Sequence, residues 1–569
     1  MAVVVAALYF GGLGAAPFLD PPEGFQAAIA RSLSLHGDWI TPRVNGIPYF
    51  DRPPFLYWLM SASFSVLGVS TAAARLPSAA AAVAIAAVTA RLGVVLGGPR
   101  LGLLAGLMVA ANLGFFVYGR LVKPDMLFIL FILLAFAGFS IAYRGGGRRG
   151  LVLFYAALGL AVMTKDMLGA IGPLAVVGVF FWLTRERPLA SWVPWWGVLI
   201  VALIALPWYL VVEARNRGFL WYLIVDNHLL NLTRHRVFPD EDVPSLNPLE
   251  FLLVTTGAFL PWALAVPAAV VRAFRGARDG VTGRLWLLHA LWAVLLIGLF
   301  TVAPFKLPHH GLPAFPALAL LTARVWDETI EAAPGSLRPR LLLVPALVLF
   351  AVVAVTFGVL WAGVLPLPGE AFVSLDVATR NLVAQGQPVP RVPIDAYRPT
   401  LLTGGIIFAV AALGMAWAAV RRAPAFGAAI AIAAMIAFLP VAANGVTQFA
   451  RVRSTRPIAA ALAVQWRPGA IIVHEGSLED SGALLLSVRE PVRVVNGLQS
   501  SLAVGATVPG ARPLFWDSPQ LQEAWRGANP VFLVSVVAPE RSVVRSLAPA
   551  SVHLVTDAGG RRLYANVAP

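Results

Sequence analysis

Carboxylates, a guanidinium and aromatic rings are gathered in one stretch, from Asp20 to Ser78, which follows an apolar opening segment. Carboxylates can accept a proton or bind a metal, a cation can bind phosphate, and aromatic side chains suit a membrane surface. A single acid is more often merely solvated, but charge that is only solvated needs no such density of rings. The combination favours a sugar-phosphate site, built from Asp20, Glu23, Asp38, Asp51, Arg52, Trp39, Tyr49, Phe50, Tyr57 and Trp58.

Short local elements must position these groups. The pattern from Ala27 to Leu35 predicts a short amphipathic helix that ends at Gly37. Thr41-Pro42 and Asn45-Gly46 are typical of turns. The aromatic segment Phe55–Leu67 is amphipathic and suited to the membrane interface.

The composition identifies a polytopic membrane protein. The chain has 569 residues, of which 59% are hydrophobic and 12% are charged, whereas soluble proteins carry about 25% charged residues. The net charge of +15 comes from arginines in short loops between apolar segments, where they set topology, so we exclude nucleic-acid binding. Because the chain has no cysteine, disulfides and Cys-ligated metals are excluded.

A bilayer core needs roughly 20 apolar residues per helix, and on that measure we predict about thirteen spans. The first lacks a positively charged leader, so we interpret it as a retained helix. The segments are 2–19, 76–96, 101–119, 125–143, 151–164, 167–184, 192–213, 250–271, 285–303, 311–324, 341–362, 400–420 and 424–443. With a cytoplasmic N-terminus, the arginine-rich loops lie inside. Residues 20–78, 216–250, 366–400 and everything after 443 then lie outside.

The three lysines among the 43 basic residues are unusually placed. Lys123, Lys165 and Lys306 all fall at predicted outer ends of helices, and the first two lie beside Asp125 and Asp166. Lysines do extend to interfaces without any function, but cations on the outer side oppose the topology rule. They are therefore candidates to face an anionic ligand in the outer cavity.

Other polar groups in the predicted outer regions widen the set of candidates. The second outer loop contributes Asn227 and His228, followed by Arg234, His235 and Arg236, and His309 and His310 follow Lys306. No cofactor motif is present, and ATP-driven transport, dinucleotide redox chemistry and esterase chemistry lack their signatures. A divalent metal is left open, with Asp51, His228, His309 and His310 as candidate ligands, although no closely spaced ligand pair demands one.

The last segment differs from the rest. Residues 446–569 carry more charge and short β-like runs, and we predict a small α/β domain outside the membrane. RSTRPIAAALAVQW is predicted to be a helix. The predicted strands are AIIVHE, ALLLSV, VRVVN, PVFLVSVV, SVHLVTD and RRLYANV.

At these residues the chain resembles a known family. GDWITPRVNGIPYFDRPPFLYWL followed by GVSTAAARLPS resembles the first outer loop of bacterial glycosyltransferases with the GT-C fold, which include lipid A aminoarabinose transferases and relatives of protein O-mannosyltransferases. Five later blocks match in order: GRLVKPDMLF, AVMTKDM, LPWYLVVEARNRGFLWYLIVDNH, GAFLPW and KLPHHGLPAFPALALL. The resemblance implies a GT-C transmembrane catalytic domain over 1–445, with its first outer loop at 20–75, and a periplasmic domain over 446–569.

The resemblance also implies roles for individual residues. Arg52 takes the position of a family lysine beside Asp51, and with Lys165, Lys306 and Lys123 it is expected to bind the donor phosphate. An acid in the first outer loop is expected to act as base. The usual acidic pair is here Pro22-Glu23, so Asp20 and Glu23 are both candidates. The expected sugar and loop residues are Tyr49, Asp51, Tyr57, Trp58 and Asp125, with Asn227 and His228 in the second outer loop.

The expected function follows from the same resemblance. The chain would transfer a sugar, with inversion, from a polyprenyl-phosphate carrier to a periplasmic lipid, glycan or protein acceptor in a bacterial inner membrane. The alternatives are a flippase or transporter of lipid-linked sugars and a catalytically inactive relative that binds glycolipid. A transporter is disfavoured because the chain shows no internal repeat. The departures at Pro22 and Phe25 keep the inactive relative open.

Overall fold

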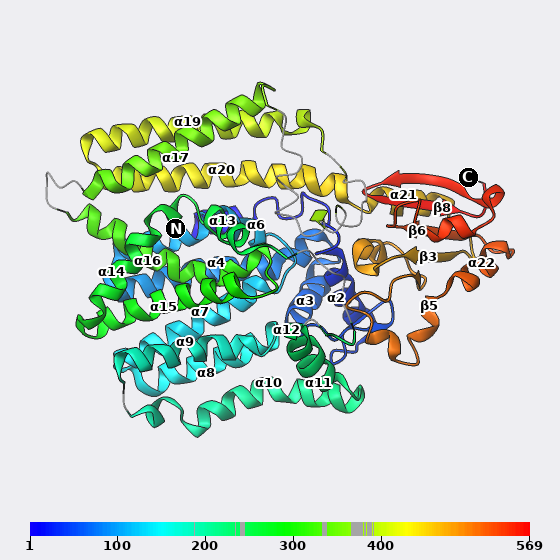
Figure 1. The fold of residues 1–569 in the computed structure, drawn as a ribbon, viewed down its shortest axis with the longest axis horizontal. Coiled ribbons are helices and arrows are strands. Elements are labelled where there is room, and N and C mark those ends of the chain that lie inside the picture. Colours follow the sequence, from blue (N-terminus) through cyan, green and yellow to red (C-terminus); the bar gives the residue numbers. More distant parts are fainter. Residues whose placement is uncertain are drawn as a thin grey trace.

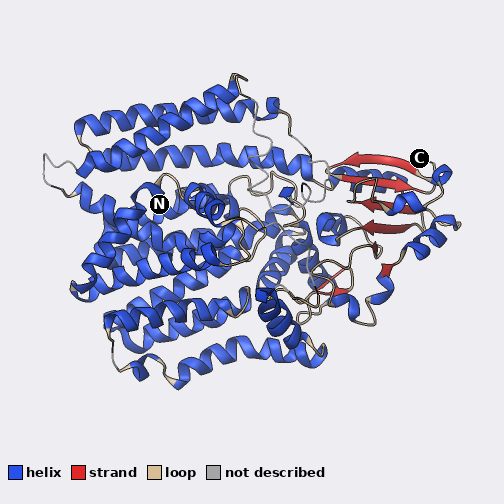
Figure 2. Cartoon of the chain, viewed as in Figure 1, coloured by secondary structure: helices blue, strands red, loops and turns tan. Residues whose placement is uncertain are grey.

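The computed structural model describes residues 1–186, 188–233, 235–238, 245–332, 338–365, 379–380, 383, 390 and 392–568. Long helices form a bundle, and the C-terminal residues lie together at one end of it (Figure 1). Two short helices of the first outer loop lie across the bundle at that end, between the long helices and a sheet. Figure 2 shows that the strands gather there. The fold therefore brings the first outer loop and the C-terminal segment into contact.

The bundle helices match the predicted apolar segments. They are α1 (Ala2–Phe10), α4 (Thr71–Gly97), α5 (Pro99–Ala110), α6 (Leu113–Gly119), α7 (Asp125–Ile141), α8 (Gly147–Thr164), α9 (Leu168–Thr184), α10 (Trp195–Arg215), α13 (Pro248–Ala258), α14 (Val266–Arg275), α15 (Gly280–Val302), α16 (Phe315–Ile330), α17 (Arg338–Trp361), α19 (Ile394–Arg421) and α20 (Pro424–Arg453). Short helical turns, η2 (Leu189–Trp192), η4 (Trp262–Ala265) and η5 (Gly276–Arg278), precede α10, α14 and α15.

By length and hydropathy, the described residues contain seven membrane-spanning stretches, or nine if two bent pairs each count as one span. The bent pairs are α5 with α6, at 64°, and α13 with the helical segment that contains α14, at 108°. One of the seven stretches, Asp125–Thr164, combines α7 and α8, which are separated by a turn at Gly145 with φ of 97°. The helical membrane architecture is therefore confirmed, whereas the count of thirteen spans stays a prediction.

Glycines allow α4 and α5 to pack closely. A β-carbon built on Gly93 of α4 would lie 2.8 Å from the Cα of Gly102 in α5. These two helices are joined at Gly98, whose φ is 98°, and α5 begins with Pro99. The first helix is shorter than the predicted 2–19, because Gly11 and Gly12 follow α1 and Gly12 has φ of 62°. Local backbone freedom thus sets both boundaries.

The first outer loop follows its predicted local structure. Helix α2 (Gly24–His36) ends at Gly37, which has φ of 70°. Strands β1 (Arg43–Val44) and β2 (Ile47–Pro48) form a hairpin whose turn is Asn45-Gly46, with φ values of 54° and 79°. Both central residues have positive φ, as a tight hairpin requires. The interfacial helix α3 spans Phe55–Leu67, the predicted range.

The second outer loop is helical where it is described. It begins with α11 (Phe219–Trp221), continues as the π-helical η3 (Tyr222–Leu230) and ends in α12 (Asn231–Thr233). The segment 235–238 then folds back towards η3, because the backbone amide of Val237 donates to the Asp226 carboxylate. Most of the predicted outer region 366–400 lies outside the described residues.

The C-terminal segment forms a six-stranded mixed sheet of order β5-β4-β3-β6-β8-β7. Strands β3, β4, β5 and β6 are parallel, and β8 and β7 pair antiparallel to complete the sheet. The bounds are β3 (Ile471–Glu475), β4 (Arg493–Val495), β5 (Phe515–Trp516), β6 (Val531–Ser535), β7 (His553–Ala558) and β8 (Arg561–Ala565), with helices α21 (Arg456–Gln465) and α22 (Ser518–Arg526).

One predicted strand is wrong. ALLLSV lies mainly in the 3-10 turns of η7 (Leu478–Leu486), not in the sheet. A short apolar run cannot by itself distinguish a strand from a buried helical turn, and here η7 packs against α2. The contact is close, because a β-carbon on Gly482 would lie 2.1 Å from the Phe25 nitrogen.

The core continues from the bundle through the first outer loop into the sheet. Phe25, Leu33, Leu484 and Leu485 belong to one cluster of buried apolar side chains. Two hydrogen bonds join Asn45 to the Val492 backbone, at 2.7 and 2.9 Å. Helix α20 also runs past residue 445, to Arg453. The division into domains at 445 therefore stays a prediction.

Candidate active site

Arg52 follows the hairpin of the first outer loop and lies above two buried tyrosines. The Tyr49 ring contacts the rings of Phe25 and Tyr57 edge-on, with centroids 5.5 and 6.3 Å apart. The Tyr57 hydroxyl donates to Gln26 Oε1 at 2.5 Å. Trp58, the next residue of α3, donates from Nε1 to the Trp39 carbonyl at 2.8 Å. The predicted sugar-binding rings therefore lie together, but Tyr49 and Tyr57 are buried in the core of the loop.

The Arg52 side chain is half-buried, yet it forms no hydrogen bond with any residue that the structure describes. Burial lowers its pKa, but the Tyr49 hydroxyl and the carboxylates of Asp166 and Asp51 outweigh burial, so the net pKa lies above the ordinary value. Arg52 therefore remains a full cation. Its five N–H donors are open to a ligand.

A second charged group lies where α7 begins and α8 ends. Asp125 is buried, and its Oδ1 accepts from Lys165 Nζ at 2.9 Å. The Nε2 of His309, which lies on η6 (Pro308–Ala314), is 3.8 Å from the same oxygen. Lys123, two residues before Asp125, lies with its amine 5.3 Å from the centre of the Tyr118 ring. The fold thus assembles two of the three predicted lysines around one carboxylate.

His310 connects this group to Arg52. Burial, together with the positive charges of Lys165, Arg52 and Lys123, lowers the pKa of His310 to about 3, against a raising effect of Asp125. His309 is also buried, and burial is the main cause that holds its pKa well below the ordinary value. Both imidazoles are therefore neutral near pH 7. Because these cations all act on His310, Arg52 and the lysines share one neighbourhood.

Lys306 begins the turn that carries the histidines. Its backbone is held by Ser245 and Leu246, at 2.9 and 3.1 Å. Its side chain is buried and forms no hydrogen bond or ion pair with a described residue. A lysine that is buried without a partner is costly. It is consistent with the predicted phosphate-binding role.

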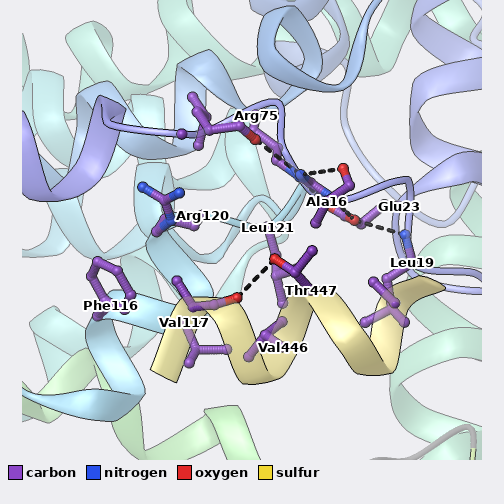
Figure 3. A pocket seen from close by; sticks show the side chains of 14 residues that line it. Ala16, Leu19, Glu23, Arg75, Phe116, Val117, Arg120, Leu121, Val446 and Thr447 are labelled. Carbon is purple, nitrogen blue, oxygen red and sulfur yellow. Dashed lines mark hydrogen bonds and ion pairs between the residues drawn. The ribbon is translucent and has the colours of Figure 1, made fainter. Parts of the chain in front are cut away.

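Glu23, one of the two predicted bases, is saturated by hydrogen bonds. Arg75 donates to both of its oxygens, at 2.8 and 2.6 Å, and the backbone amides of Leu19 and Val122 donate at 2.8 and 3.0 Å. Arg75 in turn donates to the carbonyls of Leu13, Ala16 and Pro17. Figure 3 shows this pair on the wall of a pocket, which is otherwise mainly apolar and is also lined by Arg120.

Asp20, the other predicted base, is bound to the C-terminal segment. Its oxygens accept from the Thr455 hydroxyl and the Ala483 amide, both at 3.0 Å, and its side chain is fully buried. Burial raises its pKa to about 6, partly offset by the Arg561 charge. Asp20 and Glu23 are therefore both structural contacts in this arrangement. Each oxygen of the two carboxylates accepts at least one hydrogen bond from the protein.

The second outer loop reaches the site through Tyr222. The Tyr222 hydroxyl donates to Asp51 Oδ1 in a short hydrogen bond. The predicted residues of this loop lie farther along η3, where His228 Nδ1 is 2.6 Å from the Leu223 carbonyl and Asn227 is half-exposed. We did not predict Tyr222 or Asp226 from the sequence. Their only signal was the matching block LPWYLVVEARNRGFLWYLIVDNH, which contains both.

The metal hypothesis gains no support from the part of the chain that the structure describes. Within that part, no three His, Asp or Glu side chains are arranged to hold a metal ion. Asp51 contacts Tyr222, and the His309 ring lies against those of Tyr118 and His310. The observed donor set of cations, one buried carboxylate and neutral imidazoles suits an anionic oxygen ligand better than a metal.

The chain is similar to proteins of known family. Residues 20–223 match the family described as dolichyl-phosphate-mannose-protein mannosyltransferase. The chain is 28% identical over 410 residues to the undecaprenyl phosphate-alpha-4-amino-4-deoxy-L-arabinose arabinosyl transferase of Pseudomonas paraeruginosa, covering 68% of this chain and 70% of that protein. It is 29% identical over 337 residues to the enzyme of the same name from Edwardsiella ictaluri, covering 57% of this chain and 58% of the relative.

Solved structures match over nearly the whole chain. The crystal structure of ArnT from Cupriavidus metallidurans in the apo state aligns with a TM-score of 0.79 and 24% identity, covering 99% of this chain and 97% of that one. The structure of the same protein bound to undecaprenyl phosphate gives a TM-score of 0.78 at 24% identity, covering 100% and 97%. At this identity the likeness establishes the fold, and the GT-C fold predicted from the sequence is confirmed.

Proposed function

We propose that this chain, a homologue of GT-C fold glycosyltransferases with polyprenyl-phosphate sugar donors, transfers a sugar from such a donor to an acceptor of the cell envelope. The relatives' name suggests 4-amino-4-deoxy-L-arabinose as the first sugar to test. We assign the site to the outer face of a bacterial inner membrane, because the arginine-rich loops at the opposite ends of the helices suit the cytoplasm.

The observation that carries this proposal is the state of Arg52. It is a half-buried guanidinium with no hydrogen bond to any described residue, next to a lysine pair and two neutral histidines. Such a group is costly unless a ligand supplies its partners. A phosphate monoester or diester matches the geometry of the guanidinium donors, and its negative charge balances the cations. The matched structure with undecaprenyl phosphate is consistent with this ligand class.

The chemistry then follows from the charges. An acceptor oxygen attacks the anomeric carbon as the bond from that carbon to the phosphate oxygen breaks, and polyprenyl phosphate leaves. Arg52 and Lys165 stabilise the negative charge that develops on the leaving phosphate, which is usually the larger contribution. Lys123 and Lys306 add to the positive field.

The proton of the acceptor must pass to a base. The oxygens of Asp20 and Glu23 already accept hydrogen bonds from the protein. We therefore assign the role of proton acceptor to Asp51 or Asp166, the two carboxylates whose charges act on Arg52. Asp166 already accepts from the Leu168 amide at 2.8 Å, which fixes its orientation. This assignment departs from the predicted bases, which stay alternatives for a different conformation of the loop.

The test uses the purified protein in lipid nanodiscs with a panel of undecaprenyl-phosphate sugars and a membrane extract as acceptor source. We expect release of free undecaprenyl phosphate with one donor, and a loss of about 100-fold or more in Arg52→Ala, as for removal of one charge-stabilising donor. Arg215→Ala is the matched control, because that side chain is 53% exposed and lies 3.4 Å from the half-buried Asp38 carboxylate.

The outcomes separate the alternatives. Full release in Arg52→Ala would overturn the site while leaving a transferase. Donor binding without release, across the whole acceptor panel, would overturn transfer and favour a transporter or an inactive glycolipid-binding relative.

A further inference from the structure

We propose that Tyr222, held by Arg236 and Asp226, is a positioning residue that keeps Asp51 away from Arg52 and so leaves Arg52 open to the donor phosphate. The inference rests on the proposed function and adds a role for the second outer loop. Tyr222 and Arg236 act through Asp51 and need not contact the substrate.

Asp51 and Arg52 are neighbours in sequence with opposite charges, so they would be expected to pair in a partly buried site. Their side chains nevertheless form neither an ion pair nor a hydrogen bond with each other. Asp51 Oδ1 instead receives the Tyr222 hydroxyl. The Asp51 charge acts on Arg52 only from a distance, as the effect on the Arg52 pKa indicates.

Arg236 fixes the direction of the hydrogen bond from Tyr222 to Asp51. Arg236 Nη2 lies 3.4 Å from the Tyr222 oxygen, and arginine has only donors. The Tyr222 oxygen must therefore accept from Arg236, which directs its own proton to Asp51. The Tyr222 ring is 2% exposed, with the Arg236 guanidinium 6.0 Å from its centre. This hydroxyl has little freedom to turn elsewhere.

Arg236 is itself held in place by Asp226. Its Nε donates to Asp226 Oδ2 at 3.3 Å, and the Asp226 side chain is fully buried. The other Asp226 oxygen accepts from the amides of Val237 and Phe238, at 2.5 and 3.4 Å. The Phe238 ring also meets the Tyr222 ring edge-on at 6.2 Å. The fold of segment 235–238 on η3 is therefore transmitted through Tyr222 to the first outer loop.

The experiment measures the affinity of the protein in nanodiscs for undecaprenyl phosphate alone, which separates ground-state phosphate binding from transfer. In Tyr222→Phe, Asp51 loses the hydrogen bond from the Tyr222 hydroxyl and turns towards Arg52, so we expect about tenfold weaker binding, the loss for one hydrogen bond to a charged group. The decisive variant is Tyr222→Phe combined with Asp51→Asn. The amide cannot pair with Arg52, so binding should return to the level of Asp51→Asn alone.

Tyr209→Phe is the matched control. Tyr209 lies in the same apolar cluster as Tyr222, but its hydroxyl donates to the Val162 carbonyl at 3.2 Å. We expect wild-type binding in this variant. If Tyr222→Phe fails to fold, Arg236→Gln is a second way to disturb the hydrogen-bond relay from Asp226 through Arg236 and Tyr222 to Asp51. It should also weaken binding.

Three results would overturn the inference. Wild-type binding in Tyr222→Phe, with loss in Arg52→Ala, overturns the relay and leaves the phosphate site intact. Weaker binding that Asp51→Asn does not restore means that Tyr222 is only structural. Wild-type binding in Arg52→Ala overturns the phosphate site of the proposed function and the relay with it.

Discussion

Two charged groups beside the first outer loop differ in their hydrogen bonding. In the first, Glu23 and Arg75 are both buried, and every oxygen of Glu23 has a protein donor. In the second, Arg52 forms no hydrogen bond with a described residue, and Lys165 uses one of its three donors on Asp125. Both groups contain a cation and acids close to the first outer loop.

The difference separates structural charge from charge kept for a ligand. A buried ion is stable only if its hydrogen-bonding capacity is filled. The protein fills that capacity itself around Glu23, whereas Arg52 forms no hydrogen bond with a described residue and Lys165 forms one. The position of an acid in a motif therefore says less about catalysis than the partners that the fold supplies.

The largest expected effect concerns the saturated pair. Arg75→Met leaves Glu23 as a buried carboxylate without its cation, which we expect to cost about 3–5 kcal/mol. We expect a matching loss in the free energy of unfolding, measured by denaturation in detergent. Arg75→Met with Glu23→Gln should recover part of it. A change under about 1 kcal/mol in Arg75→Met would show that the pair is not structural.

The next effect is the pH dependence of the contact between Asp20 and the C-terminal segment. The pKa of Asp20 is raised from 3.8 to about 6 in the folded state. The stability from this group is therefore present below pH 4 and is lost as the pH rises through 6, by about 2–3 kcal/mol. Asp20→Asn should flatten this part of the unfolding profile between pH 4 and 7.5. Asp395→Asn, whose side chain is 77% exposed, is the control, and an unchanged profile in Asp20→Asn would contradict the assignment.

A smaller effect is expected at Lys165. Lys165→Met removes one of the cations that act on the site, and we expect about tenfold weaker binding of undecaprenyl phosphate, measured in nanodiscs. Lys165→Arg should retain most of the affinity because it keeps the charge. If Lys165→Met binds like the wild type, Lys165 belongs with Glu23 and Arg75 as a structural ion, paired only to Asp125.

The smallest effect is expected at an exposed pair of the same loop. Arg43 lies 3.6 Å from Asp38, and both side chains are about one-third exposed, at 36% and 29%. Arg43→Gln should change the free energy of unfolding by less than about 0.5 kcal/mol and leave phosphate binding unchanged. A loss of binding as large as that of Lys165→Met would show that the functional cations cannot be identified from their hydrogen-bond and ion-pair partners.

Much of the local structure could be predicted because its causes are local. The hairpin turn at Asn45-Gly46 and the helix Phe55–Leu67 depend on positive φ and on apolar periodicity, both visible in a few residues. ALLLSV was misassigned because an apolar run has the same composition in a strand and in a buried turn. Arg52 was predicted from a family motif, Lys165 first from the placement of the three lysines, and His310 as a possible metal ligand, and the fold brings the three into one neighbourhood.

The sequence alone therefore determined the helical membrane architecture, the GT-C fold and the candidate cations, because hydropathy and motif order are properties of the chain itself. Only the tertiary structure decided which charges are occupied. Glu23 meets Arg75 across 52 residues, Tyr222 meets Asp51 across 171, and Asp20 meets the Ala483 amide across 463. Those distant partners decide whether a carboxylate is available as a base or serves as a structural contact. The cost of burying it depends on hydrogen bonds that no local sequence pattern predicts.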